Sequence, residues 1–296
     1  MRKYVQFPLI IMMSFIISAC SQGREEGALN ADEGTSFVEA KEQGKAELTV
    51  LYVPAPGFAY RDSSGELTGV SVDIMHDFIG WFQQYHGIRV SLNFVPEEDW
   101  RVFYQRVVDA EGGVFGLGNV TITEERREEL SFSPPYLDNL AVLISPEQGS
   151  QLENLDRLPD VFADLEPLAF AGTLHEVRIR QLRDQYQPQR DIARAESNQE
   201  IIDRVAAGDH YSYIDAYNYW RAKEAGSAIQ RHEIADEVGE TFGIIMPHSN
   251  DWETMLTAFF AAEGGYRDTD RYREVLEQHL GKALTDTLEN ARQRAN

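Results

Sequence analysis

Apolar residues follow two patterns along the chain, short β-rich runs and longer stretches with helical spacing. Residues 48–52 form the first β-rich run, which Pro54 and Pro56 close. Residues 70–85 then have helical periodicity, with one apolar stripe made of Ile74, Met75, Phe78, Phe82 and Tyr85. A second amphipathic helix is expected over residues 99–110, with Val102, Phe103, Val107 and Val108 facing inward.

The same alternation continues to the end of the chain. Further strands are expected at residues 88–95, 113–120, 140–145, 168–171, 191–195, 211–214 and 242–246. Further helices are expected at residues 123–130, 174–186, 197–207, 217–224, 252–262 and 269–294. Strands that alternate with helices predict an α/β architecture with mostly parallel sheets.

The N-terminus has the pattern of an export signal. Arg2 and Lys3 precede an apolar run over residues 7–17, which is shorter than the roughly 20 residues that a membrane span needs. The run ends in Ile17-Ser18-Ala19-Cys20, which resembles the lipobox of bacterial lipoproteins. We therefore predict a lipoprotein signal peptide over residues 1–19 and lipidation of Cys20, the chain's one cysteine. The alternative is a chance cysteine after an uncleaved anchor helix.

An acylated Cys20 would carry more than one fatty chain, which stable membrane anchoring requires. Ser21 at the next position indicates outer-membrane sorting if the host is Gram-negative. Residues 20–46 are rich in small and polar residues and poor in aromatic ones, which predicts a flexible tether.

Charge and composition exclude several classes of function. The formal net charge is −22, and it becomes −24 without residues 1–19, which hold two basic and no acidic residues. Such a surface repels phosphate backbones and anionic lipids, so neither nucleic acid nor a polybasic membrane contact is expected. The seven histidines lack metal-ligand spacing, and no P-loop or Ser-His-Asp pattern is present. We expect no metal and no cofactor.

Several segments together resemble a known family. They are residues 58–60, 65–69, 72–74, 100, 132–133 and 135–136, and above all Thr121-Ile122-Thr123-Glu124-Glu125-Arg126. This order is similar to extracellular solute-binding proteins of the polar amino-acid type, members of the type II periplasmic-binding-protein superfamily that serve ABC importers. The resemblance covers nearly all of residues 47–280.

The resemblance implies a two-lobed fold that hinges shut over a ligand. Two mostly parallel sheets flanked by helices would be joined by two crossover strands, at residues 141–145 and 243–247. Lobe 1 would then comprise residues 47–142 and 243–296, and lobe 2 residues 143–242. The implied function is capture of an amino acid or similar zwitterion by a monomeric receptor, with an ABC permease as its partner.

The segment around Arg126 has the chemistry of an anion site. A strand ends at Thr121 and a helix opens at Thr123, and the free N–H groups of such a helix start favour an anion. The planar fork of Arg126 can hold a carboxylate in two hydrogen bonds. Alternatively, Arg126 and Arg127 pair with neighbouring glutamates on a surface helix. The resemblance implies that Arg126 grips the ligand's α-carboxylate and that Thr121 hydrogen-bonds it.

The resemblance also implies the remaining site residues. Gly172 and Thr173 match a loop whose N–H groups would meet the other side of the carboxylate. Asp215 matches an acid that accepts the ligand's ammonium group, although an aspartate there can equally be a helix N-cap. Trp100 matches a ring stacked on the ligand, and Phe58 lies on the first cleft loop. For each aromatic residue, including the weaker candidates Tyr52, Tyr213 and Tyr217, a place in the core is the alternative.

Four positions depart from the family's pattern and leave the ligand's identity open. Asn119 replaces a glycine, so a side chain enters where backbone normally meets ligand. Pro134 replaces an aspartate, and Leu174 and His175 follow the glycine-threonine loop where smaller residues are frequent.

Three functions remain open, and we predict the first. A transport receptor needs no catalytic group, and no residue stands out as one, so we expect no enzyme. A periplasmic enzyme on the same fold is the alternative, either dehydratase-like with Asp215 as its acid or related to lytic transglycosylases. A sensor ectodomain that acts through a partner is the third possibility.

Overall fold

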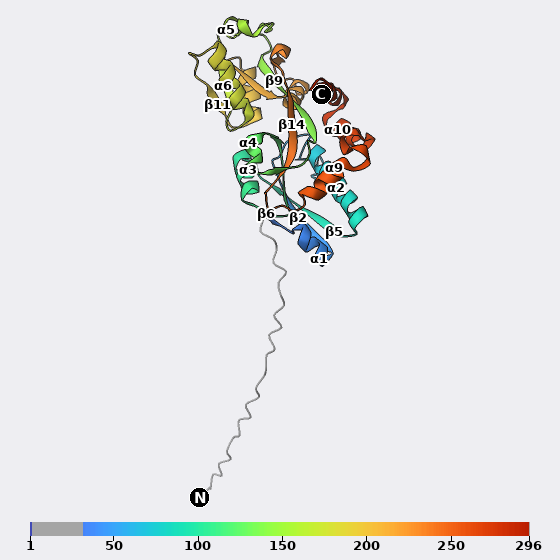
Figure 1. Ribbon diagram of the computed structural model, residues 1–296. Helices are drawn as coiled ribbons and strands as arrows, with labels where there is room; N and C mark the ends of the chain where they lie inside the picture. The colour runs from blue at the N-terminus through green and yellow to red at the C-terminus, as the bar shows by residue number, and fades with distance from the viewer. Residues whose placement is uncertain (2–31, 296) are drawn as a thin grey trace.

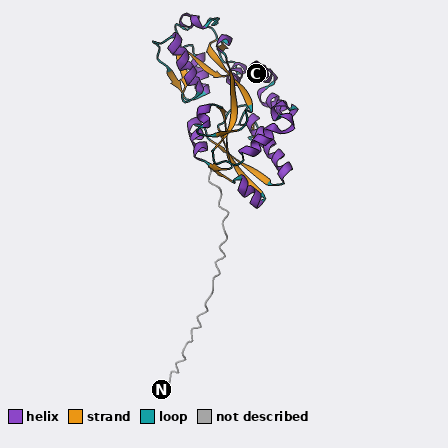
Figure 2. Cartoon of the chain, viewed as in Figure 1, coloured by secondary structure: helices purple, strands orange, loops and turns teal. Residues whose placement is uncertain are grey.

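The computed structural model describes Met1 and residues 32–295, in which strands and helices form two lobes (Figure 1). Cys20 and all but the first residue of the expected signal peptide lie outside the described residues. Strands occupy the interior of each lobe and helices lie on the outside (Figure 2). Among the described residues, no helix is long and apolar enough to cross a membrane.

Lobe 1 is built on three parallel strands. The strand β2 (Lys45–Tyr52) lies between β5 (Arg89–Pro96) and β7 (Val114–Thr121) and runs parallel to both. The flanking helices are α2 (Val70–His86), α3 (Trp100–Asp109), α4 (Glu124–Arg127), α9 (Glu253–Ala261) and α10 (Asp270–Leu280). Short strands complete the lobe, namely β3 (Tyr60–Arg61), β4 (Leu67–Thr68), β6 (Glu111–Gly112) and β8 (Ser131–Phe132).

Lobe 2 repeats this arrangement with fewer residues. Its parallel strands are β10 (Glu166–Phe170), β11 (Ala193–Ala195) and β12 (His210–Asp215), and β10 lies between the other two. Its helices are α5 (Leu158–Val161), α6 (Leu174–Tyr186), α7 (Asn198–Ala206) and α8 (Ala216–Glu224). Separate apolar clusters cover the two faces of this sheet, as expected for parallel strands buried on both sides.

Two long strands join the lobes, β9 (Leu137–Pro146) and β14 (Glu237–Met246). Their pairing makes one continuous sheet with the order β11-β10-β12-β9-β14-β7-β2-β5, to which β13 (Ile229–Arg231) adds on β9. The two strands pair with each other between residues 137–141 and 237–242. The crossovers were expected at residues 141–145 and 243–247, which is a few residues too late in each strand. Residues 141–144 already pair with β12 inside lobe 2, and residues 243 and 245 already pair with β7 inside lobe 1.

The expected tether is partly wrong. The described residues before β2 include β1 (Glu33–Gly34) and α1 (Phe37–Gln43). Ser36 and Glu39 form a capping box at the start of α1, and Phe37 packs against Phe82 and Trp252. The strand β1 pairs with β6, which lies far along the chain. Composition alone predicted a flexible segment. In the structure, the capping box starts the helix α1 and the packing of Phe37 attaches that helix to lobe 1.

Two further expectations are wrong in detail. The helix expected over residues 269–294 is two helices, α10 and α11 (Lys282–Ala295), because Gly281 has a positive φ of 78° between them. Val102, expected to face inward, is 45% exposed, while Phe103 and Val107 are buried. The helix α11 packs against β9 and β14 and so covers the strands that join the lobes.

Candidate ligand-binding cleft

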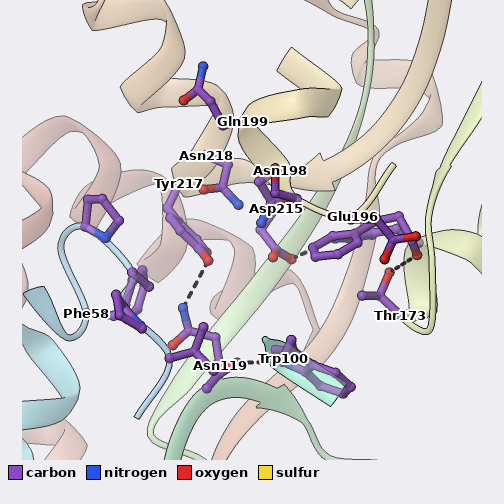
Figure 3. Close-up of a pocket in the computed structure, with 18 of the residues that line it drawn as sticks. Phe58, Trp100, Asn119, Thr173, Glu196, Asn198, Gln199, Asp215, Tyr217 and Asn218 are labelled. Carbon is purple, nitrogen blue, oxygen red and sulfur yellow. Dashed lines mark hydrogen bonds and ion pairs between the residues drawn. The ribbon is translucent and has the colours of Figure 1, made fainter. Parts of the chain in front are cut away.

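A cavity of about 770 Å³ lies between the lobes, and both lobes contribute to its walls. Seven of the eight predicted ligand-binding residues line it, namely Phe58, Trp100, Asn119, Thr121, Arg126, Thr173 and Asp215. Gly172 lines a neighbouring hollow instead. Figure 3 shows side chains from both lobes pointing into the cavity. The fold thus brings together residues that are more than 150 positions apart in the sequence.

Arg126 lies on the wall formed by lobe 1. The side chain of Thr123 accepts a hydrogen bond from the backbone N–H of Arg126 at 3.2 Å and so starts the short helix α4. The Arg126 Nη1 donates to the backbone oxygen of Thr121 at 3.0 Å. Its guanidinium lies 5.4 Å from the ring centre of Trp100, which stacks on Tyr104. These contacts hold the guanidinium in place without neutralising it.

No carboxylate lies within ion-pair distance of Arg126 among the residues that the structure describes. Arg127, by contrast, approaches Glu124 at 3.8 Å on the surface of the same helix. Burial lowers the pKa of Arg126, although Tyr104, Glu125 and Glu129 act in the opposite direction. Arg126 is therefore a partly desolvated cation that an anion in the cavity could pair with.

Asp215 lies on the wall formed by lobe 2, at the end of β12. It occupies the N-cap position of α8, but its side chain makes no capping hydrogen bond. Its Oδ1 instead accepts from Asn139 Nδ2 at 2.6 Å and contacts His175 Nε2 at 3.3 Å. Burial opposes ionisation of Asp215, but His175, Asn139 and Arg178 together lower its pKa. The carboxylate is thus ionised at neutral pH, and no hydrogen bond to Oδ2 is found among the described residues.

Behind Asp215, the buried Arg178 connects lobe 2 to the crossover strand β14. Arg178 on α6 donates from Nε to Glu237 at 2.7 Å and from Nη2 to Glu240, both on β14. Its Nη1 lies 3.0 Å from His175 Nδ1. Both ring nitrogens of His175 therefore have partners, which fixes the imidazole as a support for Asp215.

The glycine-threonine loop does not present its N–H groups to the cleft. The backbone N–H of Gly172 donates to the side chain of Glu176 at 2.8 Å, four residues further on in α6. The N–H of Thr173 is directed at the backbone oxygen of Phe170, and its hydroxyl donates to the same oxygen. The carboxylate of Glu176 thus accepts the N–H of Gly172 that was expected to meet the ligand's carboxylate. Glu176, which lies in the first turn of α6, therefore supplies the anion for this loop from the protein itself.

Asn119 links the two lobes directly. Its φ of 50° lies in the left-handed region, which asparagine tolerates better than most residues. Its side-chain Oδ1 accepts from Tyr136 Oη at 2.7 Å, and its Nδ2 donates to Tyr217 Oη at 3.0 Å (Figure 3). Tyr217 belongs to lobe 2, and its ring also meets Phe58 of lobe 1 with centroids 4.5 Å apart. The side chain of Asn119, which was expected to enter the ligand site, therefore makes a contact between the lobes.

A second contact between the lobes is electrostatic. Arg101 on α3 approaches Glu196 of lobe 2 at 3.6 Å, with both side chains more than half exposed. An exposed pair of this kind contributes little to stability. Together with the Asn119–Tyr217 hydrogen bond, it shows that the lobes meet across the cleft in this structure.

Two important residues were missed from the sequence. Asn139 and Arg178 carry no motif, and each acts through a partner remote in the sequence. Tyr136 lies in a segment of the family resemblance but was given no role in the site, where it donates to Asn119. His175 was singled out only as a departure from the family's pattern. Among residues 32–295, no cluster of His, Cys, Asp and Glu side chains could hold a metal ion.

Comparison with known proteins identifies the family. Residues 48–291 match the model for bacterial extracellular solute-binding proteins, family 3. The membrane-bound lytic murein transglycosylase F of Maricaulis maris is 26% identical over 136 residues, which are 46% of this chain. That match spans only 28% of the transglycosylase's length.

Solved structures share the fold at low sequence identity. A substrate-binding protein of an ABC uptake transporter from Streptococcus pneumoniae, with bound histidine, superposes with a TM-score of 0.65 at 14% identity, covering 83% of this chain and 96% of that one. The ancestral amino-acid-binding protein AncCDT-1, a precursor of cyclohexadienyl dehydratase, gives 0.60 at 17% identity, covering 82% and 98%. Since the family model spans most of the chain, this protein is a member of family 3 of the bacterial extracellular solute-binding proteins.

Proposed function

We propose that the protein is a receptor that captures an amino acid or a similar small zwitterion and delivers it to an ABC importer. The observation that carries the proposal is the pair of complementary charges in one cavity. Arg126 on lobe 1 is a cation with no carboxylate partner among the described residues, and Asp215 on lobe 2 is an ionised acid with Oδ2 available. A molecule with a carboxylate and an ammonium group would satisfy both.

The proposed location is outside the cytoplasm, in the periplasm or on the cell surface, as the family's description suggests. A lipid on Cys20 would attach the chain to a membrane, the outer membrane if the host is Gram-negative. We propose that the receptor acts as a monomer, because one chain contributes both walls of the cavity.

Isothermal titration calorimetry with the twenty amino acids tests this proposal, after native mass spectrometry to detect any zwitterion that copurifies. We expect Arg126→Ala to abolish measurable binding, since truncating one partner of a buried charge pair costs about 2–5 kcal/mol. Arg127→Ala is the matched control, because its guanidinium pairs on the surface of the same helix. Equal affinities of the Arg126 variant, the control and the wild type would remove Arg126 from the site.

A specific observation favours testing an enzymatic alternative. A carboxylate and an imidazole lie side by side in the cleft, and such pairs serve as acids and bases in enzymes. However, both nitrogens of His175 have partners, and the lowered pKa of Asp215 disfavours a role as a proton donor at neutral pH. We expect no turnover of prephenate-like substrates. Turnover that Asp215→Asn abolishes would establish a dehydratase-like enzyme in place of the receptor.

A further inference from the structure

Arg221 is a second cation on the wall of the ligand cavity. It lies in the last turn of α8, where it is exposed, and it lines the same cavity as Arg126 and Asp215. Among the described residues, no carboxylate lies within ion-pair distance of its guanidinium, and none accepts a hydrogen bond from it. Acidic residues outnumber lysine and arginine by 49 to 27, so this arginine lacks a partner in a chain that is rich in carboxylates.

The fold directs Arg221 across the cleft. It follows Tyr217 by four residues, about one helical turn, so the two side chains share the face of α8 that borders the cavity. A Cβ atom placed on Gly57 of lobe 1 would lie 3.9 Å from Arg221 Nη1, so the guanidinium reaches the loop that carries Phe58. Burial raises the pKa of Tyr217, Asp215 adds to this rise, and the charge of Arg221 acts in the opposite direction. The positive charge of Arg221 therefore influences a group that lines the cavity.

A second basic residue in the same helical turn has a different environment. Lys223 pairs with Glu147 at 2.5 Å and is not among the residues of the cavity wall. The C-terminal end of a helix favours a cation, so helix electrostatics alone accounts for a basic residue at either position. Of the two, only Arg221 combines a place on the cavity wall with a cation that no described carboxylate pairs with.

The helix α8 sets the spacing between Arg221 and Asp215. Asp215 is the N-cap residue of α8 and Arg221 follows six positions later, so their Cα atoms lie roughly 9 Å apart along the helix axis. Arg126 lies on the wall formed by lobe 1. The cavity thus offers two cations without a carboxylate partner and one ionised acid. Two carboxylates and one ammonium group would match them.

The other charged residues of the cavity wall are mostly occupied within the protein. Arg101 approaches Glu196, and Arg178 pairs with two glutamates of β14. Asp99 caps the start of α3. Glu98 is exposed and would instead attract an additional cation on a ligand. A test of the cavity's preference must therefore include lysine and arginine.

We infer that Arg221 forms a second anion subsite and that the ligand is an amino acid with an acidic side chain. This inference rests on the proposed function and narrows its ligand class. Asp215 would bind the ammonium group, Arg126 the α-carboxylate and Arg221 the carboxylate of the side chain. Because about one and a half helical turns separate Asp215 from Arg221, we expect glutamate or 2-aminoadipate to fit better than aspartate.

Isothermal titration calorimetry on the full chain tests the inference with aspartate, glutamate, 2-aminoadipate, glutamine, lysine and arginine. We expect glutamate or 2-aminoadipate to bind best. Arg221→Gln should weaken that ligand roughly 10- to 100-fold and leave glutamine nearly unchanged, because only a hydrogen bond to the acidic side chain is lost. Arg221→Glu should reverse the preference, so that lysine binds better than glutamate. Lys223→Gln is the matched control, because it removes the same charge from the same helical turn outside the cavity.

Three results would overturn the inference while leaving the receptor intact. The first is tighter binding of lysine or arginine than of every acidic amino acid, and the second is equal affinity of the wild type for glutamate and glutamine. The third is an equal effect of Arg221→Gln and Lys223→Gln on glutamate affinity, which a role of Arg221 in helix electrostatics alone predicts. If the wild type binds no amino acid or other small zwitterion, the proposed function itself fails, and the subsite fails with it.

Discussion

We predict that the hydrogen bond between Asn119 and Tyr217 favours closure of the lobes, and Tyr217→Phe isolates its contribution. The Tyr217 hydroxyl accepts from Asn119 Nδ2 at 3.0 Å across the cleft. Phenylalanine keeps the ring that packs against Phe58 and removes only this oxygen. Because Tyr217 is 6% exposed, the amide of Asn119 would lose its partner in a buried place.

The magnitude follows from the burial of the bond. An unpaired buried donor costs about 1–3 kcal/mol, and here the cost falls on the closed form alone. An open form would let water hydrogen-bond to Asn119, so the closed-to-open ratio should fall by roughly 5- to 150-fold. A ligand that binds the closed form would lose apparent affinity by up to the same factor.

Small-angle X-ray scattering and calorimetry together check this prediction. We expect the variant to have a larger radius of gyration than the wild type without ligand, and to return to the compact value at saturating ligand. Tyr213→Phe is the matched control, because its hydroxyl donates to the backbone oxygen of Ala235 within lobe 2. The control should lower the free energy of unfolding and leave closure and affinity unchanged. A Tyr217 variant with wild-type scattering and wild-type affinity would refute the reasoning.

Two further predictions concern pH and the N-terminus. Burial lowers the pKa of His232 from 6.5 to about 4, and its ring accepts from the Leu152 N–H and contacts Ser145. Below pH 6.5 the unfolded chain takes up a proton that the folded chain refuses, so the free energy of unfolding should drop by about 2 kcal/mol between pH 7 and pH 5. Urea titrations at both pH values should show a smaller drop in the free energy of unfolding for His232→Asn than for His248→Asn, whose histidine is exposed and serves as the control. Equal drops in the two variants would contradict the assignment of this pH dependence to His232. Cys20→Ser should move the protein from the membrane to the soluble fraction, and continued sedimentation with membranes would contradict lipidation.

Much of the fold was predictable because the periodicity of apolar residues is a local property. The stripe from Ile74 to Phe82 predicted α2, and the apolar run from residue 48 predicted β2. The neighbourhood of Arg126 was also predictable, since a strand end and a helix start lie within six residues of each other. Local composition was misleading at residues 33–46, where packing of Phe37 against a distant tryptophan orders the segment.

The sequence by itself determined most of the helices and strands, the place of Arg126 on a short helix just after a strand, the place of Asp215 at a strand end, and the strongly acidic surface. Only the tertiary structure decided what those side chains meet. The partners of Asp215 come from α6 and β9, and Asn119 finds Tyr217 nearly a hundred residues away. Gly172 gives its N–H to Glu176 rather than to the cleft. Local patterns set backbone conformation, whereas the hydrogen-bond partner of a buried polar group depends on which remote surfaces pack together.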